Sequence, residues 1–236
     1  MKTKFTLLVS LSLVLLSSCI IGPWKSGNGH VAEQTRKVSS FDEIKVSRGM
    51  NVYISQGNEI KVVVEADENL LDIISTEVDN HTLKVTTTEN IRRATSKKVY
   101  VTIPEISGIT AVAGSNAFSE NVLHSKMLEI SGSAGSNIKL EVDAGKIDAS
   151  ASAGSNIKLE GKASSFTGKA SSGANIKAEE LTVAECNARV SSGANLWITV
   201  SENLDAHASS GGNIIYYGQP KTTNIESSSG GNIVKR

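Results

Sequence analysis

The chain has 236 residues, of which 39% are hydrophobic, 20% are charged and only 4% are aromatic. Lysine and arginine together number 24, as do aspartate and glutamate, so the formal net charge is zero. This balance excludes a typical nucleic-acid binder, which needs a cationic surplus, and it disfavours a highly charged disordered chain. The low aromatic content indicates either a thin core or an interior filled by small side chains.

The N-terminus, residues 1–18, has the pattern of a lipoprotein signal peptide. Two lysines precede an apolar run, Phe5 to Leu16, which is too short to span a bilayer. The run ends in Leu16-Ser-Ser-Cys19, which resembles a bacterial lipobox. The resemblance implies cleavage before Cys19 and acylation of this cysteine, so we expect an exported lipoprotein held in a membrane of the cell envelope, the outer membrane. An ordinary signal peptide with a chance cysteine is the alternative.

Residues 19–35 are interpreted as the lipidated cysteine and a flexible tether, because glycines and Pro23 interrupt regular structure there. Many lipoproteins of the cell surface carry acids directly after the cysteine. Here the first acid is Glu33, which favours an anchor that faces the periplasm. The only other cysteine is Cys186, so a lipidated Cys19 leaves no intramolecular disulfide.

Residues 36–110 are rich in short apolar runs with the alternation of strands. A Gly49-Met-Asn51 sequence there looks like an early copy of the motif described below, and its distance from Asn116 corresponds to roughly three coils. We interpret residues 36–110 as an irregular cap and first coils of one β-helix domain, residues 36–236. A separate β domain is the alternative.

Residues 111–236 are a repeat built on Gly, then Ser, Ala or Gly, then Asn. The steps between successive asparagines are 21, 19, 19, 20, 18 and 19 residues. A fixed period near 20 over seven copies is the mark of a solenoid. The repeated asparagines are Asn116, Asn137, Asn156, Asn175, Asn195, Asn213 and Asn232.

Within each repeat the pattern has period two. The residue after each asparagine is apolar, and the residues two and four positions after it are mostly lysine and glutamate. A second alternating run precedes each asparagine, so we predict two strands and two turns per coil, with coils stacked in parallel. We expect Gly and Asn to adopt the positive φ of a tight corner, and the Asn amides to hydrogen-bond along the stack as a structural turn ladder.

The opening Val38–Val46, the segment Gly49–Ile54 and the Gly-x-Asn-Ile repeats together resemble the "putative auto-transporter adhesin, head GIN domain" family, mostly exported proteins of Bacteroidetes. The resemblance covers about residues 38–234. It implies an all-β fold, a right-handed parallel β-helix that forms a single-stranded solenoid with about 20 residues per coil. Many relatives carry Gly-Asp at the corner, whereas this chain has Asn, which argues against a cation site there.

A column of acids could indicate a carbohydrate-active β-helix enzyme. Lysines run beside it, and a catalytic pair usually interrupts a repeat, so we interpret the column as a solvated face of offsetting charges. The histidines lack the spacing of metal ligands, and Cys186 occupies a core column. We therefore expect no catalytic residue, no metal and no cofactor. The acids are Glu120, Glu141, Glu160 and Glu179, and the lysines are Lys139, Lys158 and Lys177.

The outward columns become apolar in the last coils. The column of lysines continues in the last coils as Trp197, Ile215 and Val234, and the column of glutamates continues as Tyr217. Exposed apolar stripes often mark interfaces, so we expect this one to bind a glycan, a matrix or envelope protein, or a second protomer. Covering by a C-terminal strand is the alternative. We predict a lipid-anchored, non-enzymatic envelope solenoid with a role in binding or adhesion, and a purely structural spacer is the third possibility.

Overall fold

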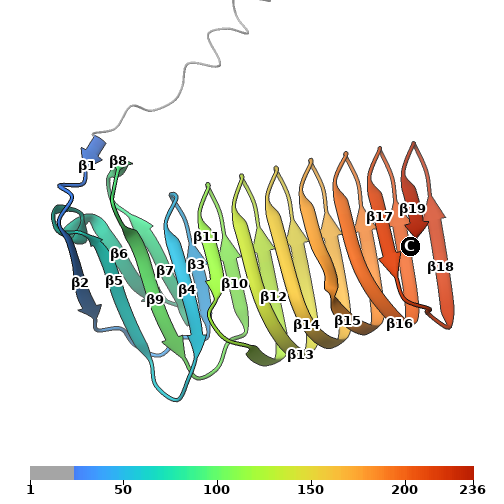
Figure 1. The fold of residues 1–236 in the computed structure, drawn as a ribbon, viewed down its shortest axis with the longest axis horizontal. Coiled ribbons are helices and arrows are strands. Elements are labelled where there is room, and N and C mark those ends of the chain that lie inside the picture. Colours follow the sequence, from blue (N-terminus) through green and yellow to red (C-terminus); the bar gives the residue numbers. More distant parts are fainter. Residues whose placement is uncertain (1–23) are drawn as a thin grey trace, which may run out of the picture.

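The computed structural model describes residues 24–236, so the predicted signal peptide and Cys19 lie outside the described residues. The described chain is an all-β solenoid of about seven turns with about 19 residues per coil, and strands make up 67% of the structure (Figure 1). The predicted fold class and coil length are confirmed. The coils stack side by side along the long axis, and β19 and β18 form the last of them (Figure 1).

The N-terminal part contains nine short strands and one 3₁₀ helix. They are β1 (Trp24–Ser26), β2 (Val31–Arg36), β3 (Glu43–Val46), β4 (Asn51–Gln56), β5 (Lys61–Asp67), η1 (Glu68–Ile73), β6 (Ile74–Asp79), β7 (Thr82–Thr87), β8 (Asn90–Arg93) and β9 (Lys97–Ile103). The regular part consists of β10 (Gly108–Ala111), β11 (Asn116–Ser119), β12 (Leu123–Gly132), β13 (Asn137–Ala151), β14 (Asn156–Ala170), β15 (Asn175–Val190), β16 (Asn195–Ala208), β17 (Asn213–Tyr217), β18 (Thr222–Ser227) and β19 (Asn232–Lys235). One 17-stranded sheet contains every strand except β1 and β8, which pair with each other.

The central coils contain one tight turn each, not the two that the sequence pattern predicted. β13 runs through the second bend without leaving the sheet, and Ala144 still pairs with Ala163 of the next coil there. In β14 a glycine lies at this bend. Gly161 has φ 113°, and a Cβ on it would lie 2.1 Å from the Val142 carbonyl oxygen, so the neighbouring backbone can approach only a glycine.

The remaining turn has two successive residues with positive φ. Ala134 has φ 50° and Gly135 has φ 71°, and the Ser136 N–H donates to the Ser133 carbonyl, which together match a type I′ turn. The motif asparagines are not among the described residues with positive φ, so that part of the prediction is wrong: each asparagine begins the next strand. Alanine or serine takes the left-handed position instead, at Ala113, Ala134, Ala153, Ser172, Ser192, Ser210 and Ser229.

Stacked turns are joined by both backbone and side-chain hydrogen bonds. The Gly135 N–H donates to the Ala153 carbonyl of the next coil (3.1 Å), and the same bond recurs along the stack. Asn156 Nδ2 donates to Asn137 Oδ1 (3.1 Å), and Asn175 Nδ2 donates to Asn156 Oδ1 (2.9 Å). An unbroken series of such amide bonds, the Asn ladder, connects Asn51, Asn116, Asn137, Asn156, Asn175, Asn195 and Asn213. Asn232 continues the row in register with Asn213.

The early motif copy lies in the neighbouring coil, not three coils away. Asn51 pairs directly with Asn116 although 65 positions separate them, and Arg48 and Gly49 have the same positive φ values as the later turns. The reason is the order in which the chain builds its layers. β3 and β4 pair with β7 and β9 on their outer side, towards the N-terminal end of the solenoid. On their inner side they pair with β10 and β11, which follow later in the chain.

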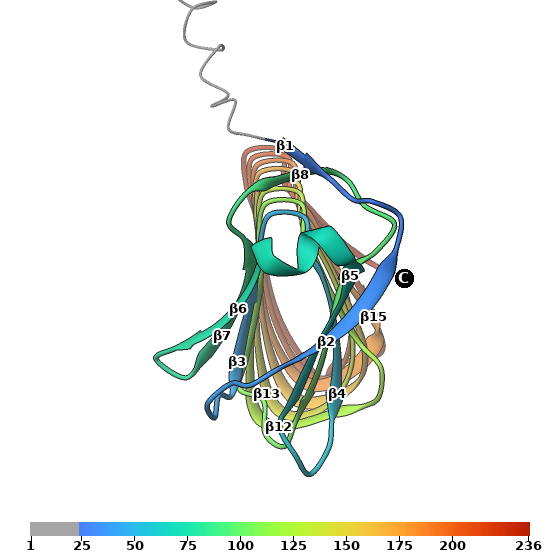
Figure 2. The ribbon, with the colours of Figure 1, turned by 90° about the vertical axis from the view of Figure 1, so that its left-hand side faces the viewer.

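The N-terminal end of the solenoid is closed by a cap. β5 runs antiparallel to β9, β2 runs antiparallel to β5, and η1 crosses the open end of the coils (Figure 2). Leu70 and Ile73 of η1 are buried. The segment predicted as a flexible tether, residues 19–35, contains β1 and all of β2 except its last residue, so the structure differs from that prediction from Trp24 onward.

Asp67 fastens this cap. Its buried carboxylate accepts hydrogen bonds from the backbone N–H groups of Gly29 (2.7 Å), Thr95 (2.7 Å) and Ser96 (3.1 Å). Burial acts to raise the pKa of Asp67, but these hydrogen bonds outweigh it and hold the pKa below the usual value. The ionised carboxylate thus joins three separate segments of the cap.

The interior explains the low aromatic content. The only buried aromatic rings among residues 24–236 are Phe41, Phe166 and Tyr216, and the rest of the buried apolar set is aliphatic or alanine, with one methionine and Cys186. A lumen enclosed by coils of about 19 residues has room for branched aliphatic side chains from each strand but for few rings. The coils therefore bury their apolar column without large side chains.

Removing one rung of the Asn ladder tests its contribution to stability. Asn156→Ala deletes one donor and one acceptor from the middle of the ladder, so we expect the free energy of unfolding to fall by about 1–2 kcal/mol in chemical denaturation. Asn232→Ala is the matched control at the end of the row and should change stability by less than about 0.5 kcal/mol. Equal effects of the two substitutions would contradict a stabilising ladder.

The Asp67 carboxylate gives a pH-dependent prediction. The folded-state pKa of Asp67 lies below its usual value, so the ionised carboxylate stabilises the cap at neutral pH, and this stabilisation is lost as the pH falls through the folded pKa. Asp67→Asn should therefore cost about 2 kcal/mol at neutral pH, and the difference from the wild-type protein should shrink in acid. Denaturation at neutral and acidic pH measures both effects; a difference that is independent of pH would contradict the assignment.

Candidate functional site

The side of the solenoid that carries the Asn ladder, here called the ladder face, presents one continuous outer row of side chains. Each member lies two residues after a ladder asparagine or pairs in register with such a residue, and it points away from the lumen. Parallel pairing places the members one coil apart, about 4.8 Å. In spatial order the outer row is Tyr100, Tyr53, Phe118, Lys139, Lys158, Lys177, Trp197, Ile215 and Val234.

The row begins with three adjacent aromatic rings, here called the aromatic triad. The ring of Tyr53 lies 5.3 Å from that of Tyr100 at an interplanar angle of 26°, and 5.3 Å from that of Phe118 at 33°. All three side chains are half-buried. This cluster was not predicted from the sequence, although Tyr53 and Phe118 both lie two positions after an asparagine of the motif.

A polar network fixes the ring of Tyr100. Its hydroxyl donates to Glu65 Oε2 (3.3 Å), while Ser96 Oγ donates to Glu65 Oε1 (2.6 Å) and Lys98 Nζ lies 3.1 Å from that oxygen. The hydrogen bond from Ser96, with smaller contributions from Lys98 and Tyr100, lowers the pKa of Glu65 against the opposing effect of burial. Burial and the Glu65 charge raise the pKa of Tyr100. The triad therefore ends on a neutral phenol held by an ionised carboxylate.

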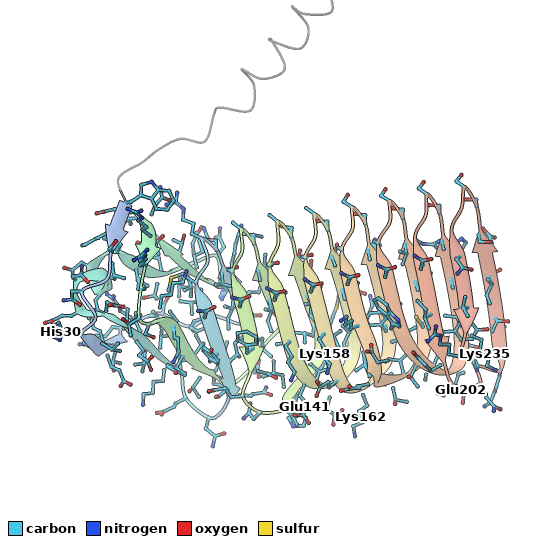
Figure 3. The ribbon with its side chains drawn as sticks, turned by 45° about the horizontal axis from the view of Figure 1, so that its top comes forward. His30, Glu141, Lys158, Lys162, Glu202 and Lys235 are labelled. Atoms are coloured by element: carbon cyan, nitrogen blue, oxygen red, sulfur yellow. The ribbon has the colours of Figure 1, made fainter. Side chains whose placement is uncertain are left out.

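The middle of the ladder face is a lattice of ion pairs. Lys158 Nζ lies 2.9 Å from Glu160 and 3.3 Å from Glu180, and Lys139 Nζ lies 3.6 Å from Glu160. Figure 3 shows charged side chains, Glu141 and Lys158 among them, on the outside of the coils. The hydrogen bond from Lys158 is the main cause that lowers the pKa of Glu160. A general acid needs a raised pKa, so Glu160 is unsuited to that role.

The predicted glutamate column is displaced in one coil. Glu160 pairs with Glu180, not with Glu179 as expected, because β15 contains one extra residue after Lys177. This β-bulge accounts for the 20-residue step from Asn175 to Asn195, which is one residue longer than each of the two steps before it. The Thr199 hydroxyl donates to the carbonyl of Glu179 (2.7 Å) and supports the bulge from the next coil.

The predicted apolar stripe forms the other end of the outer row. Trp197, Ile215 and Val234 are neighbours in register on β16, β17 and β19, and Tyr217 lies beside Thr199 on the same face. Val234 is 37% exposed, and the other three side chains are half-buried. Within residues 24–236, β18 continues the opposite side of the solenoid and β19 extends the row, so neither strand covers the stripe.

The opposite side of the solenoid has a shallow hollow of about 400 Å³ above Cys186. At its rim Asp205 accepts a hydrogen bond from Asn187 Nδ2 (3.0 Å) and lies 2.8 Å from His207 Nε2. Burial, and secondarily the Asp205 charge, raises the pKa of Cys186 to about 12, so the thiol is protonated at neutral pH and is a poor nucleophile. The described residues contain no group of three His, Cys, Asp or Glu side chains that could hold a metal ion.

The chain matches one sequence family over most of its length. Residues 40–220 match the family described as "Putative auto-transporter adhesin, head GIN domain". No curated protein matches the chain. In the part of the chain that the structure describes, no helix is long and apolar enough to cross a membrane.

Several solved structures share the fold. A "putative adhesin" from Bacteroides fragilis has 20% identity and a TM-score of 0.82, over 90% of this chain and 100% of that chain. A "putative lipid binding protein" from Parabacteroides distasonis has 19% identity and a TM-score of 0.73, over 91% and 100%. A "putative adhesin" from Parabacteroides merdae has 19% identity and a TM-score of 0.72, over 89% and 99%. At these identities the similarity shows the fold alone.

Proposed function

Because the chain belongs to the head GIN domain family, whose description names auto-transporter adhesins, we propose that it is a non-enzymatic binding module of the cell envelope. In this proposal Cys19 carries the lipid that anchors the chain, most simply in the outer membrane with the solenoid facing the periplasm. The basic start, the short apolar run and the lipobox-like end of residues 1–19 support the anchor.

The outer row of the ladder face carries the proposed binding activity. The aromatic triad and the apolar stripe occupy its two ends, eight coil steps or about 38 Å apart. Aromatic rings held by packing or by a hydrogen bond, as Tyr100 is held by Glu65, offer contact area at little cost in side-chain entropy. The row therefore suits an elongated ligand that contacts both ends.

A polysaccharide is the ligand whose chemistry fits this row best. Sugar rings present C–H faces that can pack on aromatic rings and hydroxyls that can bond to lysine and glutamate. A protein interface, by contrast, is usually depleted of lysine and glutamate at its core, where this face has its ion-pair lattice. A matrix or envelope protein is the second candidate partner.

The ion pairs of Glu160 support a binding role over catalysis. A glycosidase needs one carboxyl group with a raised pKa, and here the nearby lysines lower the pKa of Glu160. The neighbouring structures named as adhesins support the same choice. A structural spacer would not need apolar side chains at both ends of an outward row.

A glycan and matrix-protein array tests this function. We expect the wild-type chain to bind an elongated glycan, and we expect Tyr53→Ala/Phe118→Ala and Trp197→Ala/Tyr217→Ala each to weaken binding about tenfold or more. Met127→Ala, which removes a side chain that is 49% exposed outside the ladder face, is the matched control and should bind normally. Circular dichroism should be unchanged in all three.

The array also separates the alternatives. Shortened glycan products after incubation would show an enzyme, and an array with no bound ligand would favour a spacer. Full binding by both double variants would contradict the proposed surface.

A further inference from the structure

The N-terminal corner of the structure places an exposed tryptophan beside a group of cations. β1 lies beside β8 (Figure 1) and pairs with it in parallel. Trp24 lies opposite Asn90, Lys25 opposite Ile91 and Ser26 opposite Arg93. Trp24 is 58% exposed, the largest exposed fraction among the exposed large hydrophobic residues of the described chain. An indole that is so open to solvent on a two-stranded ribbon contributes little to packing.

Five cations lie on β1 and β8 or on residues close to these strands. Arg92 and Arg93 are exposed on β8, and Lys25 lies on β1. Two more lie next to these strands: Arg48, whose guanidinium donates to the carbonyl of Thr87 (2.8 Å), and Lys97 at the start of β9, whose ammonium lies next to Gly49. Within residues 24–236 none of the five forms an ion pair, whereas Lys139 and Lys158 of the ladder face do. Glu89, directly before β8, is the nearest acid in the sequence.

The corner is firmly attached to the cap. The Gly27 N–H donates to the carbonyl of Arg93 (2.8 Å), and the side chain of Asn69 bridges the strand by accepting from the Asn28 N–H (3.0 Å) and donating to the Ser26 carbonyl (2.9 Å). The Asp67 carboxylate holds the Gly29 N–H from the other side. β1 is therefore held on the cap by hydrogen bonds, and a surface that contacts Trp24 lies next to the cap.

The position of Cys19 indicates what covers this corner. Trp24 is five residues after Cys19, and a fully extended chain of that length spans at most about 17 Å. If the lipid on Cys19 is in a bilayer, Trp24 must lie close to its surface. Tryptophan is enriched at the membrane–water interface, and clustered lysine and arginine are attracted to anionic headgroups.

We propose that the β1–β8 corner, consisting of Trp24, Lys25, Arg92 and Arg93 with Arg48 and Lys97 beside them, is a contact site for an anionic lipid surface. The proposal rests on the lipid anchor of the proposed function. Docking of this rigid corner holds the cap at the membrane, and the solenoid extends from it.

The two tryptophans of the chain allow a direct test. The full chain, processed and purified from a bacterial host, is reconstituted in vesicles of brominated phosphatidylcholine with phosphatidylglycerol. Trp197→Phe leaves Trp24 as the only tryptophan, and we expect its fluorescence to be quenched by the brominated lipid. Trp24→Phe leaves Trp197, on the ladder face, which is the matched control and should not be quenched. Unquenched Trp24 in an anchored chain overturns the contact site and leaves the anchor intact.

The cations are tested by replacement with glutamine. In the Trp197→Phe background, Lys25→Gln/Arg92→Gln/Arg93→Gln should reduce the quenching of Trp24, and quenching that is unchanged overturns the electrostatic part. Recovery of the chain in the membrane fraction reports the anchor separately. If the chain is not recovered in the membrane fraction, the soluble protein is mixed with the same vesicles. We then expect the triple variant to bind the vesicles roughly 100-fold more weakly than the protein with Lys25, Arg92 and Arg93 intact. Equal binding of the vesicles by the triple variant and by the protein with its cations intact would then overturn the contact site.

Discussion

Hydrogen bonding between stacked turns is the interaction on which the rest of the structure depends. In each coil the paired positive φ values turn the backbone so that its glycine N–H donates to the next coil, and the motif asparagine adds an amide bond beside it. These bonds fix the register at one corner of every coil. Because side chains alternate along a strand, a fixed corner also decides which residues face the lumen and which face outward.

The outer row is a consequence of this register. Coils that differ in length by one or two residues still start from aligned asparagines, so residues shortly after the asparagine align even where the rest of the coil does not. The bulge at Glu179 shows the limit: alignment is lost there, and Thr199 supports the displaced carbonyl. The outward surface is thus most regular next to the ladder, where the aromatic triad and the apolar stripe lie.

The repeat could be predicted from the sequence because it depends on residues that lie close together in the chain. The asparagine spacing gave the coil length, and the alternation gave the inward and outward columns. A cap within residues 36–110 was predicted, but the order of its strands was not, because β5 to β9 intervene between two coils that touch and only long-range pairing shows that Asn51 contacts Asn116. For the same reason the triad was missed, since its rings come from three strands far apart in the chain. Strands β1 and β2 likewise depend on a remote carboxylate, Asp67.

Cysteine cross-linking tests the register most directly. Tyr53 and Phe118 are paired residues in neighbouring parallel strands, about 4.8 Å apart, which is within the range that a disulfide can bridge. Tyr53→Cys/Phe118→Cys should therefore oxidise to an intramolecular disulfide. Tyr53→Cys/Lys139→Cys, with the two positions one coil further apart at about 9.6 Å, should not. Cross-linking of the second pair in preference to the first would contradict the account.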